Sequence, residues 1–215
     1  ILYNTRPGQS ELIVIGSNSM KQTSGHFAGN AQPILSVLQQ ELPERAEVLE
    51  LASGCGQHAD FFCQQFPGVR WQPSEINIDM LQSIEAYARD TLHRNMNAPM
   101  IIDACSEWSI DPVDAILSIN LLHVSPWQAC RGLLKNAGKF LRPQGLVMFY
   151  GPFIRPDVET AASNLIFNER LKTMNPEWGV PELMKVAEEA EIHGIELKTL
   201  YELPANNVIV VLEKK

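Results

Sequence analysis

Residues 49–62, LELASGCGQHADFF, have the composition of a ligand-binding loop between a strand and a helix. An apolar run containing Glu50 leads into Gly54 and Gly56, and a segment with helical spacing follows. Glycine lets a ligand approach the backbone closely, because it has no Cβ. The next apolar run ends at Glu75, where a carboxylate can accept hydrogen bonds from both ribose hydroxyls. This pattern indicates a binding site for a nucleoside-containing cofactor.

Both NAD and S-adenosylmethionine fit that pattern, and three features favour S-adenosylmethionine. Glu50 can order the glycine loop and bind an ammonium group, and Asp103 ends the apolar run IIDA, where it can accept the adenine amino group. The third feature is the expected strand count of seven, which suits a methyltransferase better than a six-stranded dehydrogenase sheet. Two further cofactor contacts are expected at His58, beside the cofactor carboxylate, and at Asn120, which ends a later strand.

Two candidate catalytic residues follow later apolar runs. His123, in INLLHVSPWQ, is either a general base that deprotonates the acceptor or a hydrogen-bonded structural histidine. Tyr150 ends the run LVMFY and either hydrogen-bonds the substrate or packs in the core. Ser125 is expected to be the N-cap of the next helix, with Gln128 closing a capping box.

Four more residues are candidates for contact with the methyl acceptor. Arg170 either binds a substrate carboxylate or lies on a solvated helix face. The candidates are Trp127, Asn164, Arg170 and Trp178. We predict no metal site, because Cys55 and His58 lie in the cofactor loop without a second ligand pair of suitable spacing.

These residues would be positioned by strands and helices that alternate along the chain. Alternation predicts a doubly wound α/β fold, with a seven-stranded, mostly parallel sheet, an antiparallel last strand, and helices on both faces. We expect residues 1–28 to be an N-terminal extension or lid, with Met20 as a candidate start, and residues 29–215 to form one domain. The expected strands are residues 47–52, 69–75, 99–104, 113–120, 146–151, 195–203 and 206–214. The expected helices are residues 31–42, 56–66, 76–94, 126–141, 158–174 and 181–194.

Composition argues against several classes of partner. The 215 residues carry 17 Lys and Arg against 25 Asp and Glu, a net charge of −8 without a basic block, so a nucleic-acid partner is not expected. No apolar run has the length of a membrane span, and no segment has the pattern of a secretory signal. The four scattered cysteines suit a reducing compartment, so we expect a cytoplasmic protein. The oligomeric state stays open.

Several motifs together resemble one family. VLELASGCGQHADFF, WQPSE, INLLHVSPWQA, YGPF, SNLIFNERL, NPEWGV and LPANN occur in order from about Asn30 to the C-terminus. They resemble the class I methyltransferase-like family known as DUF938. The resemblance implies the class I methyltransferase fold and S-adenosylmethionine as cofactor. Glu75 stands where that family usually has Asp and keeps the carboxylate, whereas Asn168 often replaces an Asp and removes a charge.

The sequence therefore predicts an S-adenosylmethionine-dependent methyltransferase. Its acceptor would be a small molecule with an oxygen, nitrogen or sulfur nucleophile. Two alternatives stay open, namely a non-catalytic S-adenosylmethionine-binding regulatory or scaffold module, and an NAD-dependent oxidoreductase.

Overall fold

The computed structural model describes residues 21–215. Most of the expected N-terminal extension therefore lies outside the described residues. Within the part described, α1 begins at Phe27, and the chain before it lies against the domain through a hydrogen bond from Gln22 N to Ser83 Oγ (2.8 Å). Whether residues 1–28 form an extension or a lid stays a prediction.

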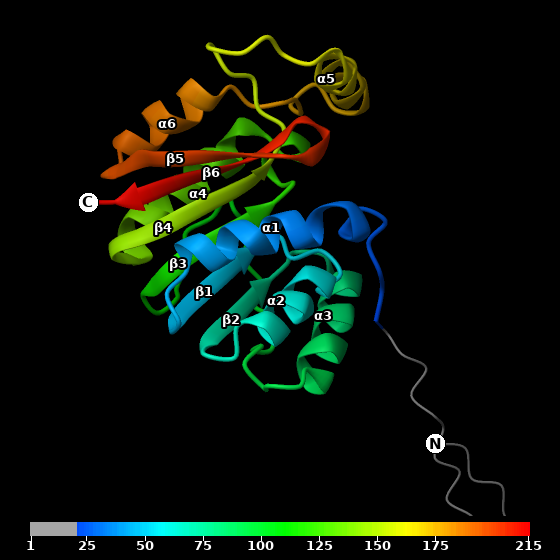
Figure 1. The fold of residues 1–215 in the computed structure, drawn as a ribbon, viewed down its shortest axis with the longest axis vertical. Helices are drawn as coiled ribbons and strands as arrows, with labels where there is room; N and C mark the ends of the chain where they lie inside the picture. The colour runs from blue at the N-terminus through cyan, green and yellow to red at the C-terminus, as the bar shows by residue number, and fades with distance from the viewer. Residues whose placement is uncertain (1–20) are drawn as a thin grey trace, which may run out of the picture.

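Six strands form one mixed sheet in the order β2-β1-β3-β4-β6-β5 (Figure 1). The strands β2, β1, β3 and β4 are parallel, and β6 runs antiparallel between β4 and β5. The expected antiparallel last strand is confirmed. The strand bounds are β1 Ala46–Leu51, β2 Val69–Ser74, β3 Val113–Ile119, β4 Leu141–Gly151, β5 Ile195–Leu203 and β6 Asn207–Lys214.

Helices cover both faces of the sheet, which confirms the expected α/β architecture. On one face, apolar residues of α1, α2 and α3 pack with Val48, Ala115 and Met148. On the other face, residues of α4 and α6 pack with Leu49 and Val147. Neighbouring strand residues point to opposite faces, so each strand serves both cores. The helices are α1 Phe27–Glu41, α2 Gln57–Gln65, α3 Ile78–Asp90, α4 Trp127–Phe140, α5 Ala162–Met174 and α6 Leu183–Glu191, with short 3-10 helices η1 Leu122–Val124 and η2 Pro204–Asn206.

The expected count of seven strands is wrong, because residues 99–104 do not form a strand. This part of the chain meets β2 at two isolated bridges, Trp71 with Met96 and Ser74 with Met100. Met96 and Met100 are four residues apart, whereas their partners on β2 are three residues apart. The register of the pairing is therefore interrupted between the two bridges. Prolines at 73 and 99 also lack the N–H that a continuous ladder needs.

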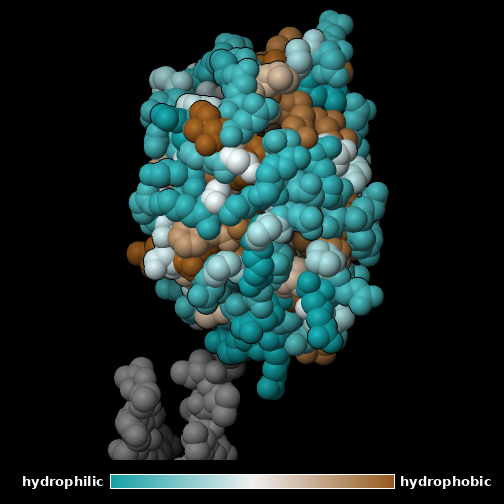
Figure 2. Space-filling model, turned by 90° about the vertical axis from the view of Figure 1, so that its left-hand side faces the viewer, coloured by the Kyte–Doolittle hydropathy of each residue, from teal (hydrophilic) through white to brown (hydrophobic). Residues whose placement is uncertain are grey.

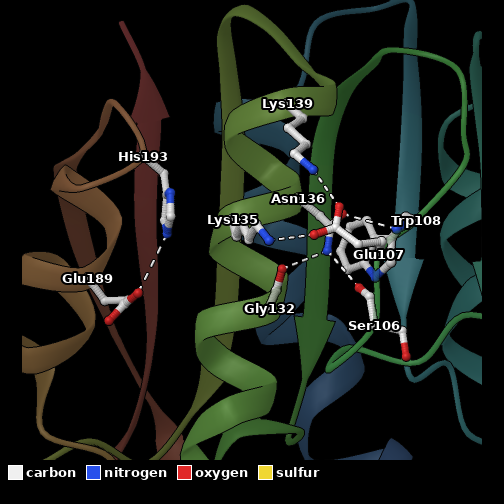
Figure 3. Close-up of polar contacts among 9 residues, drawn as sticks. All are labelled: Ser106, Glu107, Trp108, Gly132, Lys135, Asn136, Lys139, Glu189 and His193. Carbon is white, nitrogen blue, oxygen red and sulfur yellow. Dashed lines mark hydrogen bonds and ion pairs between the residues drawn. The ribbon is translucent and has the colours of Figure 1, made fainter.

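Beyond Met100 the chain leaves the sheet and is held on α4 (Figure 3). The side chain of Asn136 accepts a hydrogen bond from Trp108 N (3.1 Å) and donates to Ser106 O (2.9 Å). Gly132 permits this approach, since a Cβ there would lie 2.1 Å from Ala104 O. Glu107, whose side chain is exposed, forms ion pairs with Lys135 and Lys139 of α4 (Figure 3). The segment after Met100 is thus packed against α4 and is not paired with β2.

The capping box expected at the start of α4 is absent. The helix begins at Trp127, and Pro126 occupies the N-cap position with an extended ψ of 155°. Because Pro126 is not yet helical, Ser125 lies one residue too early to cap, and its buried Oγ finds no partner among the described residues.

The outer surface is mixed in character. On the side of the molecule shown in Figure 2, hydrophilic side chains predominate and exposed apolar side chains form separate patches. None of the described helices is long and apolar enough to cross a membrane.

Candidate functional site

The loop between β1 and α2 contains three residues with a left-handed backbone, and its two glycines have different roles. Ala52, Gly54 and Gly56 have φ angles of 58°, 56° and 87°. A Cβ on Gly56 would lie 3.0 Å from the Cα of Ile84, so this glycine lets α3 pack against the loop. A Cβ on Gly54 would project into open space, so this glycine leaves room at the surface where a ligand would bind.

Glu75 supports the glycine loop from the end of β2. Its Oε2 accepts a hydrogen bond from Gly54 N (2.9 Å), and its Oε1 accepts from Ile76 N (2.8 Å) and Asn77 N (3.2 Å). The carboxylate is buried, and its two oxygens order both the loop and the start of α3. A ribose bound here would share these oxygens with the backbone.

Glu50 is a second buried carboxylate, on β1 below the same loop. It is 1% exposed, and its Oε2 accepts a hydrogen bond from Trp71 Nε1 (2.8 Å). Burial raises the pKa of Glu50 to about 7, and the indole hydrogen bond opposes the rise. A ligand ammonium group would supply the positive charge that this carboxylate lacks.

A cavity of about 320 Å³ lies over this loop. Its lining includes four of the seven expected cofactor residues, and residues just before α1 close its other side. The volume falls within the range of small-molecule sites. The expected cofactor residues that line it are Glu50, Gly54, His58 and Asn120.

A larger cavity of about 930 Å³, here called the acceptor cavity, adjoins the first. Both cavities include His26 and Asn120 in their linings, so the two spaces meet at these residues. The expected site residues that line the acceptor cavity are Asn120, His123, Tyr150, Asn164, Arg170 and Trp178.

Asn120 has a strained backbone at this junction. Its φ is 62°, and its N–H donates to Tyr150 O (2.9 Å). Such left-handed residues other than glycine persist where the surrounding structure holds them, and they are concentrated at functional sites.

His123 is a buried imidazole in the wall of the acceptor cavity. Its ring packs edge-on against Phe167 at 5.4 Å, and a Cβ on Gly151 would lie 3.3 Å from its Nδ1. Burial, and to a lesser extent the charge of His26, lowers the pKa of His123 to about 4. The imidazole is therefore neutral at physiological pH and, within the described residues, forms no hydrogen bond to another side chain.

A buried polar network links α1 to β4 and α2. His58 Nε2 lies 2.8 Å from Asn30 Oδ1, so this nitrogen donates the hydrogen bond. Burial lowers the pKa of His58 to about 4, which leaves no positive charge for a cofactor carboxylate. Burial also raises the pKa of Tyr150, and a hydrogen bond with Asn30 opposes the rise.

Sequence reasoning missed Asn30 and His26. Asn30 lies one helical turn before Ile34 on the buried face of α1, so a polar residue at an apolar position was the available signal. His26 lies in an exposed turn just before α1, and nothing in its sequence context distinguishes it.

Four expected site residues line neither cavity, namely Gly56 and Glu75, which shape the loop as described above, and Asp103 and Trp127. Asp103 is exposed and accepts a hydrogen bond from Cys105 N (2.8 Å), so its carboxylate stabilises the turn that leads away from the sheet. Trp127 is 41% exposed at the start of α4 and lines neither cavity.

The segment around α5 forms the roof of the acceptor cavity. Asn164 Nδ2 donates to Asn206 O (3.0 Å), which joins α5 to the turn between β5 and β6. Asn168 Oδ1 accepts from Val180 N (2.9 Å), so its role is to hold the loop that carries Trp178. Among the described residues, no group of three His, Cys, Asp or Glu side chains is arranged to hold a metal ion.

Comparisons with known proteins agree with this architecture. The sequence profile of DUF938, described as a protein of unknown function, matches residues 21–214. The chain belongs to the DUF938 family. No activity is attached to that description, so the chemistry has to be argued from the site.

Solved methyltransferase structures share the fold of this DUF938 protein. Mitomycin 7-O-methyltransferase has 17% identity and a TM-score of 0.73, over 86% of this chain and 53% of that one. Human N-acetylserotonin methyltransferase in complex with SAM has 13% identity and a TM-score of 0.72, over 87% and 52%. An O-methyltransferase-like protein from Nostoc punctiforme has 18% identity and a TM-score of 0.73, over 86% and 56%. The chain thus spans about half the length of these structures, and the likeness shows the fold.

Proposed function

We propose that this DUF938 protein is an S-adenosylmethionine-dependent methyltransferase that acts on a small-molecule nucleophile, with a hydroxyl oxygen favoured. The observation that carries the proposal is the meeting of two cavities at His26 and Asn120, at the carboxyl ends of the parallel strands. Ligands of open α/β sheets bind at this edge. A methyl donor in one cavity and an acceptor in the other would face each other at the junction.

The smaller cavity fits the proposed cofactor. Gly54 leaves open space and Glu50 offers a buried carboxylate to an ammonium group. Glu75 does not line this cavity, and it would reach ribose hydroxyls with oxygens that already accept hydrogen bonds from the backbone. When bound, S-adenosylmethionine supplies a methyl group already activated by its sulfonium. The protein then has to orient the acceptor, exclude water and manage one proton.

His123 is the residue we assign to that proton. Its imidazole is neutral at physiological pH and lines the acceptor cavity. It would accept the proton that a hydroxyl loses as the oxygen gains the methyl carbon, and it would pass the proton to solvent afterwards. Asn120 and Tyr150 border the same space and can orient the hydroxyl by hydrogen bonds.

Sheet topology supports a methyltransferase over a dehydrogenase, and the second cavity supports it over a regulatory module. Dinucleotide-binding dehydrogenases have a parallel sheet of strand order 3-2-1-4-5-6, whereas β6 is antiparallel between β4 and β5 here. The solved methyltransferases of similar fold include one bound to SAM and one bound to SAH. A regulatory module would need no acceptor space, but a cavity of about 930 Å³ adjoins the cofactor cavity.

The experiment has two stages. Isothermal calorimetry with S-adenosylmethionine, S-adenosylhomocysteine and NAD should show one-to-one binding of the first two and none of NAD. Incubation with S-adenosylmethionine and a panel of hydroxylated small molecules, followed by mass spectrometry, should then reveal a methylated product. Binding of NAD alone would reject the cofactor assignment. Cofactor binding without any methylated product across the panel would favour the regulatory module.

A further inference from the structure

The acceptor cavity has a distinctive charge. Among the described residues that line it there is no Asp, Glu or Lys, and Arg170 is the one arginine. His123 in its wall is neutral at physiological pH. The cavity wall therefore carries one formal positive charge, at the exposed residue Arg170, in a protein whose net charge is −8. Such a site attracts an anion and disfavours a protonated amine.

Arg170 has no carboxylate partner among the described residues. The neighbouring cation on α5, Lys172, differs in this respect, because it forms an ion pair with Glu169 at 3.2 Å. An unpaired guanidinium presents a planar set of donors that matches a carboxylate in a bidentate geometry.

The remaining walls of the cavity are largely apolar and aromatic. Tyr150, Phe167 and Trp178 contribute rings, and Leu171 and Met174 contribute aliphatic surface. Aromatic walls favour flat, conjugated ligands, which stack on them or meet their edges. The cavity of about 930 Å³ exceeds the space that a single ring would need.

The positions of His123 and Arg170 indicate how a ligand would be oriented in the cavity. Phe167 contacts the ring of His123 at a centroid distance of 5.4 Å. Arg170 follows Phe167 by about one turn of α5, which is roughly 4.5 Å along the helix axis. A ligand that reaches both residues would carry its nucleophile and its anionic group at opposite ends of its skeleton, and a skeleton of two fused rings is the probe chosen below.

We propose that the methyl acceptor is a flat aromatic carboxylate, with its carboxylate bound by Arg170 and its hydroxyl at the His123 end of the cavity. This proposal rests on the proposed methyltransferase function and specifies its substrate class. Arg170 is then the residue that determines specificity, since it distinguishes acids from neutral aromatic compounds of the same shape.

A matched pair of ligands tests the charge requirement. Calorimetry would compare 6-hydroxy-2-naphthoate with 6-hydroxy-2-naphthamide, which has the same shape but no charge. The saturated complex with S-adenosylhomocysteine should bind the carboxylate about tenfold or more tightly than the amide, the effect of a charge-assisted hydrogen bond. Arg170→Met should bring the two affinities within about twofold of each other, and Arg170→Lys should restore part of the preference.

Lys172→Met provides the control, because it removes a cation from the same helix that is paired and does not line the cavity. This variant should keep the full preference for the carboxylate. Equal binding of the two compounds, binding of neither at millimolar concentration, or a preference that survives Arg170→Met would overturn the proposal.

The same titrations without S-adenosylhomocysteine separate this proposal from the proposed function. A carboxylate preference that depends on Arg170 in a protein that binds no S-adenosylhomocysteine would support the anion site and reject the methyltransferase. Normal S-adenosylhomocysteine binding without a carboxylate preference would reject the anion site alone.

Discussion

At the scale of single residues, burial decides what each candidate can do. Glu50, His58 and His123 are all buried, and burial shifts the pKa of each toward its neutral form. His58 is engaged with Asn30, whereas the imidazole of His123 faces the acceptor cavity without a side-chain hydrogen bond from the described residues. Two histidines with similar pKa values therefore have different surroundings.

His123 should act as a base whose activity persists at mildly acidic pH. Below its pKa of about 4 the imidazole is protonated and cannot accept a proton, so the methylation rate falls only near that value. Between pH 8 and 5.5 we expect less than about a twofold loss of kcat, whereas an unperturbed imidazole would lose about tenfold. His123→Asn should lower kcat by about 100-fold without changing S-adenosylhomocysteine affinity.

His93→Asn is the control for this measurement, because His93 is exposed and lines neither cavity. Full activity in His123→Asn would remove His123 from the proposed mechanism, whereas a steep acidic loss near pH 6.5 in the wild type that vanishes in His123→Asn would show that the pKa of the base is not lowered.

Gly54 should be required for cofactor binding, and a second glycine allows a matched comparison. Gly54 and Gly194 both have a left-handed backbone, with φ of 56° and 72°, and a Cβ on either would meet nothing within 4 Å. Valine at either position should destabilise the fold by about 1–2 kcal/mol or more through backbone strain. Only Gly54→Val should weaken S-adenosylhomocysteine binding, by about tenfold or more, as measured by calorimetry. Equal affinities in the two variants would show that the loop does not face the ligand.

At the scale of elements, the segment after α3 shows how close packing overrides strand propensity. The run PMIIDA is apolar enough to form a strand, yet the chain leaves the sheet after Met100 and packs on α4. Asn136 and Gly132 on α4 make that path possible through hydrogen bonds and close approach. The sheet consequently ends at β2, apart from two isolated bridges.

Gly132→Ala should therefore be strongly destabilising, although alanine favours helices. The new methyl group would lie 2.1 Å from Ala104 O, so the segment would have to move, at a cost of about 1–3 kcal/mol or more. Gly29→Ala is the comparison, since a Cβ on this helical glycine in α1 meets nothing within 4 Å and should stabilise the fold by up to about 1 kcal/mol. Chemical denaturation would measure both, and equal stability of the two variants would contradict the close approach of α4.

At the scale of the whole molecule, the fold brings together two cavities whose residues come from distant parts of the chain. Residues before α1 close the smaller cavity of about 320 Å³, while α5 and the β5–β6 turn enclose the acceptor cavity. Segments from distant parts of the chain thus cover the edge of the sheet at which the two cavities lie. The same burial that shapes the cavities makes stability depend on pH.

Stability should rise from pH 4.5 to about 6.5. In this window the unfolded chain protonates both His58 and His123, whereas the folded protein keeps them neutral, so raising the pH favours folding. Glu50 acts in the opposite direction, because its folded pKa of about 7 keeps it protonated while the unfolded carboxylate is ionised. From these three groups, the unfolded chain binds about one proton more than the folded protein. The free energy of unfolding should therefore rise by roughly 1.4 kcal/mol per pH unit.

Glu50→Gln removes the opposing group, so its unfolding free energy should rise about twice as steeply over the same window, as measured by urea denaturation. A flat or falling profile in both proteins would show that the two imidazoles are charged in the folded state.

The sequence by itself determined the features that depend on local pattern. Hydrophobic periodicity located the helices and six of the seven expected strands, and it placed the GCG loop and Glu75 at one edge of the sheet, because parallel strands align their carboxyl ends. Tertiary structure alone decided the features that depend on contacts between distant segments. The loss of the strand at residues 99–104, the position of Asp103 in an exposed turn, and the link between Asn30 and His58 all follow from packing that no local pattern records. The low pKa of His123 likewise requires burial, which only the assembled fold provides.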